Sequence, residues 1–199
     1  MGRIEALGRR ALALRADVGD PAQAVAAVEE TARGMGRIDA LVNNAGVGVL
    51  GPLDALTLAE VDRVLAVNVR GVFLTTRAAA ARMGSGGRIV TIGSCMAARV
   101  PGPGGTLYAM SKAALTGLNK ALARELGGRG ITANLVNPGP VDTDMNPADG
   151  PHAAAQSALT ALGRFGTTQE VAALVSFLVG PDAAYVTGAE FAVDGGHAA

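Results

Sequence analysis

Short apolar runs alternate with longer helix-like stretches along the whole chain, and this alternation limits the possible folds more than any other feature of the sequence. Strands are expected at residues 10–17, 37–46, 86–94, 130–139 and 188–196, and helices at residues 21–36, 58–83, 106–126, 152–163 and 167–180. Helical connections between strands keep the strands parallel and cover both faces of the sheet. The sequence therefore predicts an α/β fold with a doubly wound, Rossmann-like parallel sheet, in a single domain over residues 1–199.

Local signals mark where several of these elements begin, bend or end. Three helix starts carry capping patterns: Asp20 with Pro21, Thr57 with Glu60, and Thr167 with Glu170. The helix over 58–83 is expected to bend or break around residues 68–71. The apolar run within 37–46 is of the type buried on both faces of a sheet. The polar segment 140–151 is predicted as a loop.

Composition narrows the possible function classes. The 17 basic and 17 acidic residues cancel, which argues against a nucleic-acid-binding surface or attachment to an anionic membrane. No apolar run approaches the roughly 20 residues of a membrane span. A single cysteine cannot form an internal disulfide, which suits a reducing cytoplasm. The arginines near the start weakly resemble a transit peptide, but a strand-like run follows at once, so we expect a cytoplasmic protein.

Polar and glycine-rich clusters follow the predicted strands at their carboxyl ends. These clusters read ADVGD, NNAG, GS and NPGP. Ligands of open parallel sheets bind beyond the carboxyl ends of the strands, so the clusters predict a site at one edge of the sheet. Small residues in NNAG would let the backbone approach a ligand closely, whereas ordinary turn chemistry is the alternative reading of Asn43 and Asn44.

The stretch YAMSK places a tyrosine and a lysine four residues apart near the start of the helix 106–126. Positions i and i+4 share one face of a helix, so Tyr108 and Lys112 should lie together. A free tyrosine has a pKa of about 10, and a neighbouring ammonium would lower that value toward neutrality. Ser94, at the end of its strand, could hydrogen-bond a substrate oxygen beside the phenol. Taken alone, the pair could equally be an ordinary contact on a helix surface.

Several motifs occur together and in one order: NNAG at 43–46, Asn68 in VNVRG, Ser94 in IGS, YAMSK at 108–112, NPGPVDT at 137–143 and VDGG at 193–196. On these motifs the chain resembles the classical short-chain dehydrogenase/reductase family across essentially its full length. Within that family it is most similar to 3-oxoacyl-acyl-carrier-protein reductase-like members. The resemblance implies an NAD(P)-dependent oxidoreductase that interconverts a carbonyl and a secondary alcohol.

The resemblance also implies roles for individual residues. Tyr108 would be the catalytic acid/base, and Ser94 would position the substrate oxygen. Lys112 would lower the tyrosine pKa and bind the nicotinamide ribose, and Asn68 would hold a water of the proton relay. The further cofactor-binding residues implied are Asp17 and Val18 at the adenine, Asn44, Ala45 and Gly46 at the adenosine, and Pro138, Gly139, Val141 and Thr143 at the nicotinamide.

The resemblance sets in part-way through the family's pattern. The family begins with a strand, a glycine-rich turn that holds the pyrophosphate, a helix and a second strand. No such turn follows a strand near the front of this chain, so a portion on the order of 30 residues or more is expected to be missing. Two explanations stay open, of which the first is favoured: Met1 is an internal start in a longer protein, or the chain is a shortened product. If the chain is made as written, we expect the strand at 37–46 to be left as an edge or the strand at 10–17 to slide beside it.

The remaining candidates receive structural interpretations. His152 and His197 are expected at the surface, and no metal site is predicted. Asp142, Asp144 and Asp149 could suggest a cation site, but a solvated loop is the expected reading. Cys95 is expected to be a packing residue beside Ser94.

Two function classes remain for the chain. The first is the NAD(P)-dependent enzyme, with a small carbonyl or alcohol substrate and with NADP favoured over NAD by the resemblance. The second is a non-catalytic nucleotide-binding or regulatory protein, or an inactive truncated product, which the missing glycine-rich turn favours. The Ala- and Leu-rich helices at 69–83 and 106–126 are more apolar than solvent-facing helices need to be. The family pairs these helices across a two-fold axis, which implies a homodimer or homotetramer.

Overall fold

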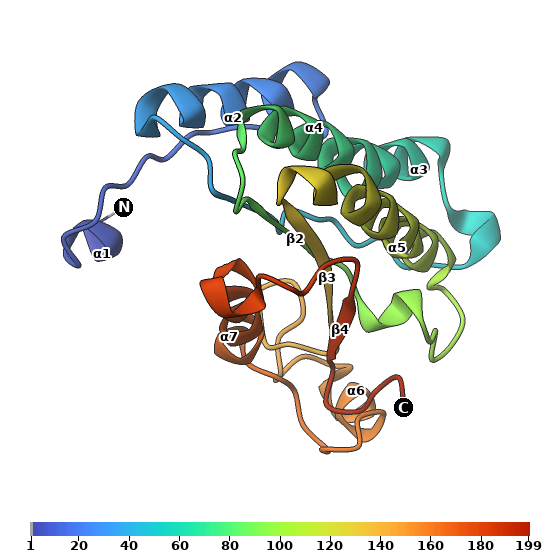
Figure 1. Cartoon of the computed structure of the whole chain (residues 1–199). Coiled ribbons are helices and arrows are strands. Elements are labelled where there is room, and N and C mark those ends of the chain that lie inside the picture. The colour runs from blue at the N-terminus through green and yellow to red at the C-terminus, as the bar shows by residue number, and fades with distance from the viewer. Residues whose placement is uncertain (1) are drawn as a thin grey trace.

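The computed structural model describes residues 2–199 and contains one parallel sheet of four strands in the order β1-β2-β3-β4. The strands are β1 (Ala40–Asn43), β2 (Arg88–Ile92), β3 (Thr132–Pro138) and β4 (Glu190–Val193). Each strand pairs in parallel with the next one along the chain, for example Val42 with Val90 and Ile89 with Ala133. The predicted α/β fold with a parallel sheet is confirmed (Figure 1).

Helices cover the two faces of this sheet unequally. On one face lie α2 (Pro21–Met35), α4 (Val72–Arg82) and α5 (Thr106–Leu126), with α3 (Leu58–Leu65) beside them (Figure 1). Their apolar side chains pack on Ile89, Ala133 and Leu135. On the other face α7 (Thr168–Val179) packs on Val90 and Val136. The short helices α1 (Gly2–Glu5) and α6 (Ala153–Ala158) lie at the periphery, and α6 is shorter than the predicted 152–163.

The capping signals place the helix starts as predicted. The Asp20 carboxylate accepts hydrogen bonds from the main-chain N–H groups of Ala22 and Gln23, and Pro21 is the first residue of α2. Thr57 and Thr167 both form complete capping boxes with the glutamate three residues later. These starts depend only on residues within one helical turn, so the sequence alone predicts them.

The helix predicted over 58–83 is interrupted by a π-helical stretch, η2 (Ala66–Gly71), between α3 and α4. The break falls where the sequence predicted it. By length and composition the stretch Leu58–Arg82 could cross a membrane, contrary to the expectation that no apolar run is long enough. However, 56% of its most apolar window is buried inside the protein, as in a core helix.

The strand predicted at residues 10–17 is wrong. The segment is an extended stretch without sheet pairing, and Leu12 and Leu14 are partly exposed. It lies along α2, where the Arg10 guanidinium donates to the oxygen of Gly34 (2.6 Å). Its alternating residues favour an extended backbone, but β1 pairs only with β2, so no neighbouring strand completes a ladder.

The expected burial of β1 on both faces is also wrong. Val42 is 41% exposed, whereas its register partner Val90 on the same face is fully buried. β1 is an edge strand, and α7 packs mainly on β2 and β3. Of the two arrangements expected from the sequence, the described residues adopt the one in which β1 is the edge and 10–17 has not moved beside it.

Candidate active site

Four residues that the sequence singled out meet at the carboxyl end of β2. Ser94 follows β2, Tyr108 and Lys112 lie in the first two turns of α5, and Asn68 lies in η2. Ser94, Lys112 and Asn68 are buried, and Tyr108 is partly buried. The parallel sheet and the helix after β2 bring these groups together, as expected for a site beyond strand ends.

Tyr108 and Ser94 form the centre of this group. Burial raises the pKa of Tyr108, and the Ser94 hydroxyl lowers it again in part. The net direction is upward, so the lowered pKa that the sequence analysis expected for Tyr108 is wrong, while the role of Lys112 beside the phenol stays a prediction. Lys112 Nζ lies 5.8 Å from the centroid of the Tyr108 ring, and removal of the phenol from water is the largest cause of the raised pKa.

Lys112 is a buried ammonium held by the sheet. Its Nζ donates a hydrogen bond to the main-chain oxygen of Ile92 (2.9 Å), the last residue of β2. Burial lowers the pKa of Lys112 from its ordinary value of 10.5 to about 8. An ammonium has three N–H groups, so up to two remain for groups that enter the site. The interpretation of Lys112 as a surface residue is excluded by its burial.

Asn68 ties η2 to the loop that follows β1. Its amide oxygen accepts from the N–H of Val47 and its amide nitrogen donates to the oxygen of Val47, both at 2.9 Å. The same nitrogen donates to Ser111 Oγ (3.0 Å), and that hydroxyl donates to the oxygen of Tyr108 (2.8 Å). Asn68 therefore links the loop after β1 to the turn of α5 that carries Tyr108.

Gly46 lies in the narrow space between these groups. A Cβ atom at this position would stand 3.4 Å from Lys112 Nζ and 3.5 Å from Asn68 Oδ1. Asn44 and Ala45 lie beside it and are exposed. The absence of a side chain at Gly46 thus keeps the space beside the Lys112 ammonium free of a Cβ atom.

Asn43 has a structural place in the sheet and is not part of an exposed turn. It ends β1 and is buried. Its amide oxygen accepts a hydrogen bond from the Thr75 hydroxyl (2.7 Å), and its amide nitrogen donates to the hydroxyls of Thr76 (2.9 Å) and Thr91 (3.3 Å). The turn reading of Asn43 is therefore wrong. This network joins β1 to α4 and β2 through side chains.

Asp17 and Val18 lie against α3 and η2. The Asp17 carboxylate accepts from Arg63 (2.9 Å) and from the N–H of Gly19 (2.8 Å). These bonds hold the pKa of Asp17 below its ordinary value, with the Gly19 bond as the largest cause. Arg70 donates to the oxygen of Gly19 (2.8 Å), so the turn is held from two positions on the helix.

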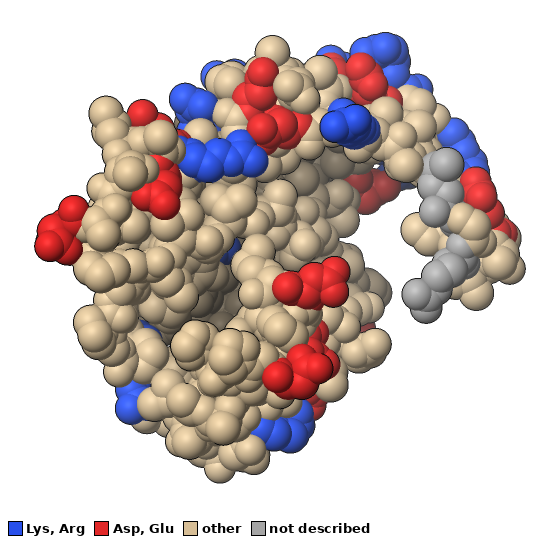
Figure 2. Space-filling view, turned by 180° about the vertical axis from the view of Figure 1, so that it is seen from behind, with Lys and Arg blue, Asp and Glu red and all other residues tan. Residues whose placement is uncertain are grey.

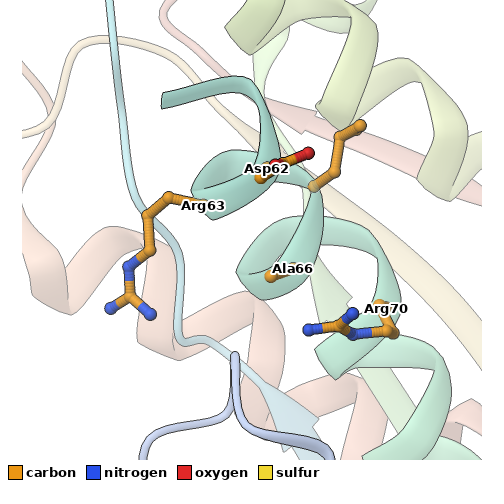
Figure 3. Close-up of a pocket in the computed structure, with 5 residues that line it drawn as sticks. Asp62, Arg63, Ala66 and Arg70 are labelled. Atoms are coloured by element: carbon orange, nitrogen blue, oxygen red, sulfur yellow. The ribbon is translucent and has the colours of Figure 1, made fainter. Parts of the chain in front are cut away.

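A surface pocket lies on this side of α3 and η2, lined by Asp62, Arg63, Leu65, Ala66 and Arg70. Figure 3 shows Arg63 and Arg70 pointing to the same side of the helix, which agrees with their bonds to Asp17 and Gly19. The pocket contains none of the predicted site residues. Because both arginines are exposed and already bonded to the chain, the pocket does not form a built anion site.

The residues predicted to contact the nicotinamide follow β3. Pro138 ends the strand, and Gly139 approaches β4 so closely that a Cβ would stand 2.6 Å from the Cα of Asp194. Val141 forms an isolated bridge with Gly166, and Thr143 forms one with Asn146. Pro138 thus lies at the same end of the sheet as Ser94, on the next strand, and the other three residues belong to the segment that follows it.

One residue at this edge was missed by the sequence analysis. The Asn137 amide oxygen accepts a hydrogen bond from the main-chain N–H of Ser94 (3.1 Å). A Cβ on Gly93 would stand 2.1 Å from the same oxygen, so only glycine permits this contact. Asn137 had been included in the motif NPGP without a role of its own. The two residues are separated by 43 positions, so only the register of β2 on β3 shows the contact.

The structure also places the minor candidates of the sequence analysis. Cys95 is buried, and burial raises the pKa of its thiol to about 11, which agrees with a packing role. His152 and the three loop aspartates are exposed, and no cluster of metal ligands occurs among the described residues. The surface position expected for His197 is wrong, because the side chain is 3% exposed. The chain after β4 folds back, and Arg99 donates to the oxygen of His197 (2.6 Å).

Charges of both signs are mixed on the face shown in Figure 2, which is hollowed at its centre. No extended surface of one sign is visible on that face, in agreement with the equal numbers of basic and acidic residues.

Comparisons with known proteins agree on one family. A family model described as Enoyl-(Acyl carrier protein) reductase matches residues 2–198. The chain is 45% identical over 169 residues to the cyclic-di-GMP-binding biofilm dispersal mediator protein of Escherichia coli, covering 85% of this chain and 71% of that protein. It is 40% identical over 185 residues to D-threitol dehydrogenase of Mycolicibacterium smegmatis, covering 91% and 71%. A short-chain dehydrogenase from Burkholderia cenocepacia, solved in complex with NADP, matches with a TM-score of 0.98 and 53% identity, covering 100% of this chain and 81% of that one.

Proposed function

The chain belongs to the short-chain dehydrogenase/reductase family, and from this premise we propose that Tyr108 is the acid/base of an NAD(P)-dependent interconversion of a carbonyl and a secondary alcohol. The observation that carries the proposal is the meeting of Ser94, Tyr108 and the buried ammonium of Lys112 at the carboxyl end of β2. A phenol beside a hydroxyl and a buried cation is suited to proton transfer at a substrate oxygen.

Each side chain has a definable part in the reductive direction. Ser94 Oγ accepts from the N–H of Met96 (3.2 Å), which leaves its own hydroxyl proton to donate to a carbonyl oxygen. Tyr108, kept neutral by burial, then gives its phenolic proton to that oxygen as the alcohol forms. The phenolate left behind is stabilised by Ser94 and by the positive charge of Lys112. In the oxidative direction the same proton returns to Tyr108.

The residues present fit a nicotinamide cofactor at its ribose end. Lys112 has N–H groups to spare, and the missing Cβ of Gly46 leaves room beside its ammonium. When bound, the cofactor supplies or accepts the hydride. We assign Asn44, Ala45, Gly46, Lys112, Pro138, Gly139, Val141 and Thr143 to its binding, and Asp17 and Val18 to the adenine end. NADP(H) is favoured because the Burkholderia relative was solved with NADP.

Asn68 acts in this proposal through the elements that it joins. Its amide is engaged with Val47 and Ser111, so it holds the loop after β1 against the turn of α5 that carries Tyr108. The role of holding a relay water belongs to the same proposal. π-helical turns frequently occur at functional sites, and Asn68 lies in such a stretch.

Assembly and location complete the proposal. Phe73 on α4 and Met110 on α5 are about half exposed, at 51% and 50%, which supports a homodimer or homotetramer through these helices. Light scattering at micromolar concentration measures this, and a strictly monomeric species would contradict it. The single free cysteine supports a cytoplasmic location.

The first experiment measures NADPH oxidation by the purified protein against a panel of aldehydes and ketones. Tyr108→Phe removes the transferable proton and should lower kcat by about 10³-fold, since general acid–base catalysis contributes 10²–10⁴-fold. Tyr185→Phe is the matched control, because Tyr185 is fully exposed. If Tyr108→Phe kept more than a few per cent of the parent kcat, the assigned role would be wrong.

A second function is favoured by one comparison. The Escherichia coli relative named for binding cyclic di-GMP is 45% identical to this chain, which supports a nucleotide-binding or regulatory role without turnover. Calorimetric titration with cyclic di-GMP and with NADPH separates the two proposals. Binding of cyclic di-GMP together with no carbonyl reduction by any member of the panel would favour the regulatory role.

A further inference from the structure

The backbone of Ser94 is held by a side chain from the neighbouring strand. Ser94 follows the end of β2, and its main-chain N–H donates to the amide oxygen of Asn137 on β3 (3.1 Å). Both residues are more than nine-tenths buried. The preceding residue, Gly93, donates its own N–H to the oxygen of Val136 (2.7 Å). The Asn137 amide thus adds a side-chain bond directly after a main-chain bond between the two strands.

The packing around this bond allows little freedom. A Cβ on Gly93 would stand 2.1 Å from Asn137 Oδ1 and 3.2 Å from Leu135 Cδ1, so the glycine is what lets the amide reach Ser94. Pro138, the next residue of β3, has no N–H group, and Gly139 donates to Val193 of β4 instead. Beyond Asn137 the next main-chain N–H group bonds to β4, so the Asn137 side chain provides the hydrogen bond to the residue after β2.

The bond constrains the hydroxyl that faces Tyr108. Ser94, whose N–H donates to Asn137, has an extended backbone (φ −166°, ψ 148°), and its Oγ accepts a hydrogen bond from the N–H of Met96. The main-chain N–H of Ser94 and one acceptor position of its hydroxyl are therefore occupied. The hydroxyl proton is left for the phenol of Tyr108 or for a substrate oxygen.

From this geometry we propose that Asn137 is a positioning residue, which fixes Ser94 so that its hydroxyl donates toward Tyr108 and the substrate oxygen. The inference rests on the proposed function, because positioning matters only if Ser94 acts in the reaction. Asn137 supplies an uncharged acceptor, so it satisfies a buried N–H without placing a negative charge beside a phenol that must release a proton.

A double-mutant cycle tests whether Asn137 acts through Ser94. Asn137→Ala should lower kcat by about tenfold while the KM for NADPH stays within about twofold, since one neutral hydrogen bond contributes about 1 kcal/mol. Ser94→Ala should lower kcat further. The double variant should be no slower than Ser94→Ala alone, because the amide has nothing left to position. Effects that multiply in the double variant would overturn the proposal.

Asn134 provides the matched control on the same strand. It is also buried, its amide nitrogen donates to the oxygen of Val186 (2.7 Å), and its amide oxygen accepts from the N–H of Ala189 (3.2 Å). Asn134→Ala should lower the melting temperature at least as much as Asn137→Ala but leave kcat of the folded protein within about twofold, because the bonds lost lie away from Ser94. Equal losses of kcat in the two variants would mean that Asn137→Ala acts by destabilising β3 as a whole, and the proposal would be wrong.

A second measurement needs no turnover, so it separates failure of this inference from failure of the proposed function. Amide hydrogen exchange followed by NMR should be about tenfold faster at Ser94 in Asn137→Ala, with Gly93 unchanged. Unchanged exchange at Ser94 would show that the bond does not hold Ser94 in solution and would overturn the proposal. If exchange at Ser94 is faster but the protein reduces no carbonyl, the hydrogen bond between Asn137 and Ser94 is supported and the proposed enzyme function is rejected.

Discussion

The centre of the sheet and the segment before α2 both contain short apolar runs, but these runs differ in structure. The runs that form β2 and β3 are buried on both faces, and every second residue meets a helix layer. The run at 10–17 is equally apolar, yet Leu12 is 46% exposed and the segment pairs with no strand. β1 is intermediate, since it pairs on one side only. The difference shows that an apolar run becomes a buried strand only where neighbouring strands and helices cover it.

Truncation of one leucine in each region should produce the largest contrast. Leu135→Ala removes a fully buried side chain from β3 and should lower the free energy of unfolding by about 2–5 kcal/mol. Leu12→Ala removes a half-exposed side chain and should change it by less than about 0.5 kcal/mol. Urea unfolding followed by circular dichroism measures both. A loss of several kcal/mol for Leu12→Ala would mean that the segment is folded against the sheet in solution.

A register pair tests the same contrast within the sheet. Val90 and Val42 are cross-strand partners on one face, but Val90 is fully buried and Val42 is 41% exposed. Val90→Ala should cost about 2 kcal/mol, from two buried methyl groups and a partial cavity, and Val42→Ala clearly less. Thermal unfolding of the two variants decides this. Equal losses would indicate that β1 is covered in solution, for example by a second copy of the chain.

The buried lysine should give the smallest effect and one that depends on pH. Burial lowers the pKa of Lys112 from 10.5 to about 8, so between these values the folded protein binds fewer protons than the unfolded chain. The free energy of unfolding should therefore rise with pH between about 8 and 10.5. Below pH 8 the buried charge of Lys112 lowers the stability of the folded protein. Lys112→Met removes the cost of burying the charge but also the hydrogen bond to Ile92. The net result at pH 7 should be a free energy of unfolding higher by about 1–2 kcal/mol, and the increase should be smaller at pH 10.

The chain's other lysine is the control for this prediction. Lys120 lies on the same helix, but its side chain is 65% exposed and pairs with Glu190 (3.4 Å). Lys120→Met should show no comparable gain at pH 7. NMR titration of the reductively methylated lysines should also place the midpoint of Lys112 near pH 8. A midpoint near 10 would mean that Lys112 is solvated, and the buried-ammonium part of the site would have to be abandoned.

Much of the fold could be predicted because the signals are local. The residues that begin α2, α3 and α7 cap their own first turns, so no tertiary contact is needed to find them. The break at η2 was also placed correctly. The strand at 10–17 and the burial of β1 could not be judged in this way, since both depend on which strands lie beside them.

In the candidate site, too, the features that depend on nearby residues were predicted and those that depend on distant segments were missed. Tyr108 and Lys112 are neighbours on one helix, so their pairing follows from a spacing of four residues. Asn137 was missed because its partner is on another strand, and the direction of the Tyr108 pKa was missed because burial depends on the packed neighbours. The position of His197 was missed for the same reason, since the chain end is buried only by folding back over residues near Arg99.

By itself, the sequence determined the helix starts, the strand–helix alternation and the identity of the chemical groups, because each depends on residues a few positions apart. Only the tertiary structure decided which apolar runs became strands, how far Tyr108 and Lys112 are removed from water, and that Asn137 holds the backbone of Ser94. These properties come from contacts between segments far apart in the chain. Hydrogen-bond ladders and desolvation exist only once such segments have packed against one another.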